Sequence, residues 1–358
     1  MGNMLSENDI IAQIERDPQS LIQVEWARLD VERKSQCPNL VRPPDLFLKL
    51  SMKNRSAHFA VEIFSGSSRA ILINKIDQIM KIANLCDSLP LLIAPYLSSG
   101  QRKLCRDRQV FYIDLSGNQW ISIEGFLIER EGFKNKYPEG REGRSPFSDK
   151  ASLIIRELIV HYGKARRVRE LADHLDLSAG YVSKMAAELE DRGYIHKSQK
   201  GLLLINPEEL IADWVNHYNI KNNQQFRYFL AVISVDEVLK KIRHLELPES
   251  GYAISAQAGA NLVYKHAAHD VVHIYTEDDR MRSKIVSSLN LELVEHGENI
   301  ILMKPKYQKS VFYQSRNIQG LNVVSDLQLY LDLYNYPKRG REQAKKIYDL
   351  KLAPLFKG

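Results

Sequence analysis

A short segment near residue 140 divides this chain more clearly than any other feature of its sequence. Residues 131–148 read Glu-Gly-Phe-Lys-Asn-Lys-Tyr-Pro-Glu-Gly-Arg-Glu-Gly-Arg-Ser-Pro-Phe-Ser, with three glycines, two prolines and dense charge. A segment of this composition packs little and is typical of a linker. The chain of 358 residues is also too long for one ordinary domain of ~100–150 residues. We therefore expect separate folded parts on the two sides of a linker at 133–147.

The patterns of apolar residues predict three domains, at 1–132, 148–215 and 216–358. In the first, strand-like and helix-like segments alternate, and the apolar run Leu89–Leu97, closed by Ser-Ser-Gly, is typical of a strand buried on both faces. Alternation at these lengths predicts a small α/β domain. The third domain also mixes strands and helices. The expected fold class is therefore α/β and α+β multidomain.

Composition excludes several classes of protein. The chain is 44% hydrophobic and 26% charged, which is typical of globular proteins and excludes collagen-like or wholly disordered chains. No apolar stretch approaches the ~20 residues of a membrane helix, and residues 1–16 lack a cationic-then-apolar signal segment. Cys37, Cys86 and Cys105 are widely spaced with no metal-like pattern, so we expect a cytoplasmic protein without cofactor or metal.

The net charge of +6 permits binding to nucleic acid, but where the charges cluster decides whether it occurs. The strongest local pattern lies in the domain at 148–215. Its segments predict three helices followed by a hairpin, which is the outline of a winged helix-turn-helix. The expected helices run from Ser148 to Gly163, over Val168–Leu175 and over Ser178–Arg192, and the hairpin strands are Tyr194–His196 and Leu202–Ile205.

The third of these helices is the candidate for entry into the major groove of duplex DNA. Val182, Met185 and Leu189 recur at the spacing of one buried face. Ser178 can cap the helix start, and short or polar side chains occupy the outward face near it, where such a helix meets bases. We expect base contacts from Tyr181, Ser183 and Lys184, helix capping by Ser178, and phosphate contacts from Lys164, Arg166, Arg167, Arg169, Lys197 and Lys200.

The alternative interpretation of the same pattern is a three-helix module that binds protein and carries a solvated basic face. No arginine or asparagine stands at the start of the third helix to indicate a particular base, so the sequence does not reveal an operator.

The first domain carries part of a nuclease pattern. Asp45 opens one expected strand and Glu62 lies in the next, where a PD-(D/E)XK nuclease places the two carboxylates that hold Mg²⁺. Position 64, where that pattern requires a lysine to activate water, is Phe64. We therefore expect a degenerate restriction-endonuclease-like domain with no catalytic residues. An active metal-dependent nuclease, targeted by the winged helix, is the alternative.

Three further patterns admit a structural or a functional interpretation. The segment Asp114-Leu-Ser-Gly-Asn118 is expected to be a tight turn, with a nucleic-acid or partner contact as the alternative. A basic helix face is expected to be solvated, although it could extend a DNA footprint; its residues are Arg102, Lys103, Arg106 and Arg108. His266, His269 and His273 are close in sequence, but we expect no metal site there.

The order of these parts resembles the AbiEi-type antitoxins of type IV toxin–antitoxin systems over roughly residues 40–350. The segments that carry the resemblance are Leu91–Ser98, Tyr112-Ile-Asp-Leu-Ser-Gly-Asn118, the helix-turn-helix, Ser325-Asp-Leu-Gln-Leu-Tyr-Leu-Asp-Leu333 and Gly340–Ala344. The resemblance implies a bacterial regulator that binds double-stranded DNA and represses its own operon at inverted repeats. It also implies that the C-terminal domain counteracts a partner nucleotidyltransferase toxin.

Overall fold

The structure is a computed structural model that describes residues 5–22, 24–32, 42–52, 55–66, 68–137, 145–245, 247–248, 250–265, 269–337 and 339–357. The chain forms two compact units. The N-terminal unit comprises Met1–Glu142 with Leu189–Gly193, and the C-terminal unit comprises Gly143–Glu188 with Tyr194–Gly358.

The N-terminal unit is built on one mixed sheet whose seven strands lie side by side in chain order. The three middle strands, β3, β4 and β5, are parallel, and the outer pairs are antiparallel. Parallel neighbours require a crossover, which helices α2 and α3 supply here. The strands are β1 (Ala27–Val31), β2 (Leu46–Met52), β3 (Arg55–Ile63), β4 (Leu89–Ala94), β5 (Phe111–Asp114), β6 (Gln119–Ile123) and β7 (Phe126–Arg130).

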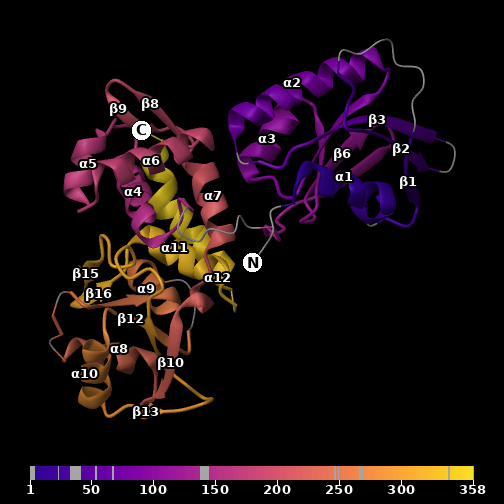
Figure 1. Cartoon of the computed structure of the whole chain (residues 1–358). Helices are drawn as coiled ribbons and strands as arrows, with labels where there is room; N and C mark the ends of the chain where they lie inside the picture. The colour runs from indigo at the N-terminus through magenta and orange to yellow at the C-terminus, as the bar shows by residue number, and fades with distance from the viewer. Residues whose placement is uncertain are drawn as a thin grey trace. The chain divides into compact units, whose positions relative to one another are not determined.

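Helices cover both faces of this sheet (Figure 1). Helix α1 (Glu7–Arg16) packs on one face through Ile10 and Ile14, and α2 (Arg69–Leu85) and α3 (Ser99–Asp107) pack on the other. Strand β4 accordingly contributes alternate residues to two separate cores, Leu91 and Ile93 to one and Leu92 and Ala94 to the other. The predicted burial of this strand on both faces is confirmed.

The C-terminal unit begins with three helices and a hairpin, in the predicted order, except that the last residues of the third helix, from Leu189 on, are grouped with the N-terminal unit. The third helix has a buried side that includes Val182 and Met185. Arg166 joins the hairpin as an isolated bridge, because its backbone exchanges two hydrogen bonds with Leu202, at 3.0 and 2.9 Å. The elements are α4 (Asp149–Val160), α5 (Val168–His174), α6 (Ala179–Asp191), β8 (Ile195–Ser198) and β9 (Gly201–Leu204).

A second seven-stranded sheet completes the C-terminal unit, in the order β13-β10-β14-β12-β11-β16-β15. The pairs β12–β14 and β11–β16 are parallel and the other pairs are antiparallel. Its strands are β10 (Gln224–Phe229), β11 (Tyr252–Ser255), β12 (Val272–Thr276), β13 (Glu292–Leu293), β14 (Ile300–Lys304), β15 (Arg316–Ile318) and β16 (Leu321–Val323).

Six α-helices follow the hairpin among the described residues, and Figure 1 labels each of them. They are α7 (Pro207–His217), α8 (Val235–Arg243), α9 (Ala256–Val263), α10 (Asp279–Leu289), α11 (Asp326–Tyr334) and α12 (Gly340–Ile347). Short 3-10 or π turns lie at Pro18–Leu21, Ile220–Asn222, Tyr348–Leu352 and Ala353–Phe356.

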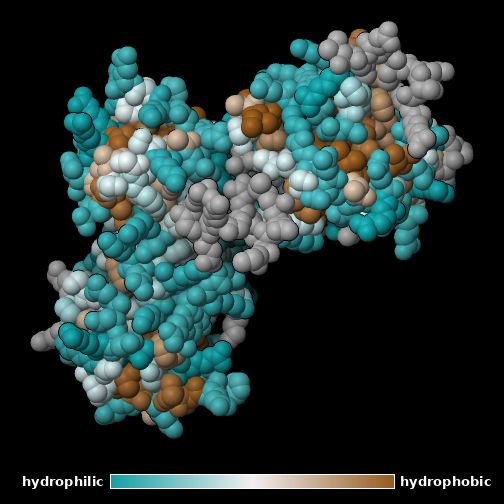
Figure 2. Space-filling model, viewed as in Figure 1, coloured by the Kyte–Doolittle hydropathy of each residue, from teal (hydrophilic) through white to brown (hydrophobic). Residues whose placement is uncertain are grey.

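Most of the surface visible in Figure 2 is hydrophilic, and an apolar area appears where β13 lies. Leu293 of β13 is 67% exposed because this two-residue strand forms the edge of its sheet. Within the described ranges, no helix has both the length and the apolar character that crossing a membrane requires.

One glycine is required by the close approach of two backbones in the hairpin. Gly201 has a φ of +131°, and a Cβ atom there would lie 2.6 Å from the Arg166 carbonyl oxygen. We expect Gly201→Ala to lower the free energy of unfolding by about 1–3 kcal/mol, since the strand must move or strain. Gly180→Ala is the control, because its Cβ would meet no atom within 4 Å and alanine favours a helix. Urea denaturation measures the free energy of unfolding of both variants. If Gly180→Ala lowered it as Gly201→Ala does, the expectation would be contradicted.

Candidate DNA-binding face and the polar networks behind it

Helix α6 presents the side chains that the sequence predicts for base contact. Ser178 caps this helix, since its hydroxyl accepts a hydrogen bond from the Tyr181 backbone N–H at 3.2 Å. Tyr181 and Ser183 are partly exposed and Lys184 is exposed, on the side opposite the buried residues. The N-terminal part of α6 is therefore accessible, as a helix that enters a major groove requires.

Five of the six predicted phosphate contacts lie at the surface, on elements that precede or follow α6 in the chain. Lys164, Arg167 and Arg169 are exposed at the start of α5 or just before it, and Lys197 and Lys200 are exposed on the hairpin. These five cations are thus exposed to solvent on elements next to α6 in the chain, and their contact with phosphate remains a prediction.

Arg166 differs from the other predicted phosphate contacts. Its side chain is only 22% exposed, and its Nη2 lies 3.0 Å from Oε1 of Glu157. The backbone of Arg166 also pairs with the hairpin, so both its side chain and its backbone interact within the protein. A phosphate contact from Arg166 remains a prediction, but it would have to share a guanidinium that is already paired.

Glu157 on α4 is a central residue that sequence analysis missed. Its carboxylate is 1% exposed and accepts a hydrogen bond from the Tyr313 hydroxyl. His161 Nδ1 and His174 Nε2 lie 3.2 and 3.6 Å from its oxygens, and both would be ion pairs when protonated. The sequence did contain a signal for this burial, because Arg156 and Glu157 interrupt the apolar stretch Leu153–Val160. A helix that is apolar on all sides is buried, and charged residues within it are then buried too.

The neighbouring Arg156 is also buried, at 2% exposure, and contacts helix α11. Its Nη2 donates to Oε1 of Gln328 at 2.5 Å, and its guanidinium carbon lies 5.1 Å from the ring centre of Trp214. Burial lowers the pKa of Arg156 to about 10. The arginine remains charged at neutral pH and links α4, α7 and α11.

Asp332 is the acceptor at the centre of the network that Arg156 joins. It is fully buried and accepts hydrogen bonds from Tyr218 (2.5 Å), Tyr275 (2.9 Å), Gln328 Nε2 (3.0 Å) and Ser255. Burial raises the pKa of Asp332 to about 6, although these donors act in the opposite direction. The segment Gln328-Leu-Tyr-Leu-Asp332, which carries part of the family resemblance, is therefore a buried structural connection.

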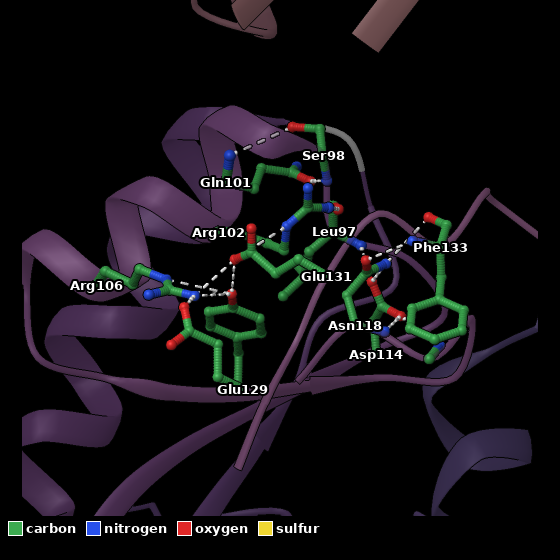
Figure 3. Close-up of polar contacts among 12 residues, drawn as sticks. Leu97, Ser98, Gln101, Arg102, Arg106, Asp114, Asn118, Glu129, Glu131 and Phe133 are labelled. Carbon is green, nitrogen blue, oxygen red and sulfur yellow. Dashed lines mark hydrogen bonds and ion pairs between the residues drawn. The ribbon is translucent and has the colours of Figure 1, made fainter. Parts of the chain in front are cut away.

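Another segment that carries the resemblance, which includes Asp114 and Asn118, forms a turn in the N-terminal unit (Figure 3). The Asp114 carboxylate accepts from the backbone N–H groups of Gly117 and Asn118, each at 2.9 Å, and of Leu97 at 3.1 Å. The Asn118 side chain then bonds the backbone of Phe133. Burial raises the pKa of Asp114 while these donors oppose the rise. The expected tight turn is confirmed.

The basic face of α3 differs from the solvated face that we expected. Arg102 is 7% exposed and donates to the Leu97 carbonyl at 2.6 Å, and Arg106 lies between Glu129 and Glu131, at 2.7 and 2.8 Å (Figure 3). Arg108 pairs with Asp77 at 3.1 Å. Only Lys103 and Arg108 are largely exposed. The expectation was wrong for Arg102 and Arg106, because acids distant in sequence fold back onto them.

The two carboxylates of the nuclease pattern do lie near one another in the N-terminal unit, with a lysine beside them. Glu62 is fully buried; Lys75 Nζ of α2 is 3.4 Å from one of its oxygens and Gln78 Nε2 is 3.0 Å from the other. Asp45 instead accepts from the Ile63 backbone N–H at 2.7 Å. Burial and the charge of Asp45 raise the pKa of Glu62.

Phe64, at the position where the pattern requires lysine, is buried in the core beneath α2. Lys75 thus neutralises the buried Glu62 from a helix, which spacing along a strand could not predict. No cluster of three or more histidine, cysteine or acidic side chains suited to a metal ion occurs among the residues that the structure describes.

The structure describes two histidines of the predicted group, His269 and His273, and His273 lies on β12. His273 is 3% exposed, and its ring contacts Tyr336 edge-on at 5.3 Å. Burial lowers the pKa of His273 to about 4, so the ring is neutral at physiological pH. His266, the third member of the sequence group, lies outside the described residues.

The low pKa of His273 predicts a specific loss of stability in acid. Between pH 6.5 and about 4 the unfolded chain protonates this histidine and the folded chain does not, so the free energy of unfolding falls as the pH falls. We expect His273→Gln to remove about 3 kcal/mol of that decline. Urea denaturation at pH 7 and pH 4 measures it for both proteins. Equal declines in the two proteins would contradict the assignment. Asp332 also makes the stability depend on pH, but it is present in both proteins and its contribution cancels in the comparison.

Two family models match parts of the chain. Residues 203–353 match the family described as transcriptional regulator, AbiEi antitoxin, type IV TA system. The region 203–353 is of the AbiEi type. Residues 158–201, from the end of α4 to the hairpin, match the MarR family. The matches confirm the resemblance to AbiEi-type regulators.

These matches identify the chain as carrying the parts of a DNA-binding transcriptional regulator of a type IV toxin–antitoxin system. No curated protein and no solved structure gave a significant match. The restriction-endonuclease-like character of the N-terminal unit therefore remains a prediction.

Proposed function

We propose that this protein is an antitoxin that represses its own operon and counteracts a nucleotidyltransferase toxin. The observation that carries the proposal is the start of α6, which is capped by Ser178 and accessible. This helix lies in a region that matches a family of regulators, and an AbiEi-type region follows it in the chain. In this proposal 148–215 is a winged helix-turn-helix domain, 216–358 acts on the toxin, and the protein works in the cytoplasm without a cofactor.

The DNA contacts divide into two groups by chemistry. Tyr181, Ser183 and Lys184 face outward from α6 and would meet base edges, while the cations around α5 and the hairpin would meet phosphates. Phosphate contacts supply affinity without sequence preference, and base contacts supply the preference. Lys184→Ala should therefore reduce discrimination between operator and other duplexes more than it reduces total affinity.

The proposal is tested with the full chain and a labelled duplex from the promoter of its own gene. We expect that duplex to bind more tightly than a scrambled one of equal length, and a reporter behind the promoter to be repressed. Co-expression should restore growth to cells that express an adjacent nucleotidyltransferase. If no duplex binds at moderate salt, the protein-interaction alternative stands instead.

A second candidate function is favoured by one observation, the position of Lys75 beside Glu62. A nuclease of this type would cut supercoiled plasmid with Mg²⁺ or Mn²⁺ and lose that activity on Asp45→Ala or Glu62→Ala. We propose instead that this domain is degenerate, because the Glu62 carboxylate is fully buried and already occupied by Lys75 and Gln78. The same plasmid assay distinguishes the two.

A further inference from the structure

Helix α4 lies beside the DNA-binding elements in sequence, yet its polar side chains bond to the far end of the chain. Asp149 accepts from the backbone N–H groups of Lys309 and Ser310, at 3.1 and 2.9 Å. Two turns later Arg156 donates to Gln328, and Glu157 accepts from Tyr313. The partners lie in residues 305–315, the connection between β14 and β15, and in α11.

Glu157 also contacts the DNA-binding elements themselves. Arg166, 3.0 Å away, is the residue whose backbone bridges to the hairpin, and His174, 3.6 Å away, is the last residue of α5. The buried carboxylate of Glu157 therefore contacts three parts of the unit: Arg166, which bridges to the hairpin, the end of α5, and the 305–315 segment. A buried carboxylate holds its donors in place because losing any one of them leaves its charge less well stabilised in a low dielectric.

Tyr313 can hold this carboxylate only as a donor. Burial and the Glu157 charge both raise the pKa of Tyr313, so its hydroxyl keeps its proton at physiological pH. Tyr313 is itself partly exposed, and Lys306, Gln308 and Lys309 of the 305–315 segment are exposed.

We propose that Glu157 is a positioning residue for DNA binding. In this proposal the hydrogen bond from Tyr313 couples the conformation of the 305–315 segment to Glu157. The inference rests on the proposed function, because it assumes that the face around α6 binds duplex DNA. Operator binding should then order the 305–315 segment, and by reciprocity a molecule that displaces Tyr313 should weaken operator binding.

The test uses Tyr313→Phe, Glu157→Gln and the double variant in the full chain, with the promoter duplex as probe. We expect Tyr313→Phe to weaken binding about 5-fold and Glu157→Gln about 20-fold. The double variant should be no weaker than Glu157→Gln alone, since Tyr313 acts through the carboxylate. Tyr334→Phe is the control: it removes a hydroxyl that accepts from Arg341, and binding should not change.

A second readout separates positioning from a purely structural role. Amide hydrogen exchange in 305–315 should slow when operator is added to the natural protein, and this slowing should be lost in Tyr313→Phe. Variants that lower the melting temperature but keep the operator Kd and the exchange response would overturn the inference. Additive losses in the double variant would also overturn it. If the natural protein binds no duplex, the proposed function fails first and this inference fails with it.

Discussion

Replacing Asp332 with alanine is expected to lower the free energy of unfolding by about 3–5 kcal/mol. The carboxylate accepts from two tyrosines, a serine and an amide, all buried. Without it these donors lose their acceptor inside the protein, at a cost of about 1–3 kcal/mol for each group left unsatisfied. Arg156 would also lose a nearby negative charge that helps to keep it ionised. Relief from burying the carboxylate offsets only part of this loss.

Urea denaturation of the full chain measures the effect of Asp332→Ala. Asp349→Ala is the matched control, because it breaks an exposed pair with Lys345 at 2.8 Å and should cost at most about 1 kcal/mol. Asp332→Asn should fall between the two, since it keeps one acceptor oxygen but adds donors. Equal losses for Asp332→Ala and Asp349→Ala would show that the network contributes little to stability.

The double substitution of Arg167 and Arg169 by alanine is expected to weaken binding to every duplex by about 10–100-fold at physiological salt. Both residues are exposed at the start of α5, beside the proposed reading helix. If each meets one phosphate, the slope of log K against log salt should fall by about 2 in magnitude, because fewer counterions are released. The preference for operator over scrambled duplex should change little.

A charge-matched control separates contact from net charge. Lys240 and Lys241 of α8 are also exposed, and their replacement by alanine removes the same two charges from another part of the unit. Salt titrations of the two double variants should differ. An identical change in slope would mean that overall charge, and not phosphate contact at α5, accounts for the effect.

Local patterns predicted the helices of the DNA-binding region well. The spacing of Val182 and Met185 and the cap at Ser178 are confirmed, because helix periodicity and capping depend on residues within four positions of one another. The two-sided burial of β4 was predictable for a similar reason, since an unbroken apolar strand has no face suited to water. The DNA contacts themselves remain predictions.

Long-range pairing was the part that local patterns could not supply. Arg102 and Arg106 were expected to be solvated. In the structure Arg102 pairs with Glu131, and Arg106 pairs with both Glu129 and Glu131. Lys75 reaches Glu62 from a helix thirteen positions away, although the strand position that should hold a lysine holds Phe64. Such partners are chosen by how elements pack, and many charged residues along a sequence could satisfy each acid.

Short-range patterns were enough to predict the helix–helix–helix–hairpin order and the AbiEi-type segments, while the linker at 133–147 stays a prediction. The hydrogen-bond partners of those segments became visible in the structure. It places Asp114 and Asp332 at the centres of buried hydrogen-bond networks, and it joins α4 to residues more than 150 positions later. The physical reason is that a buried polar group must find partners wherever the fold brings them, and sequence distance does not constrain that choice.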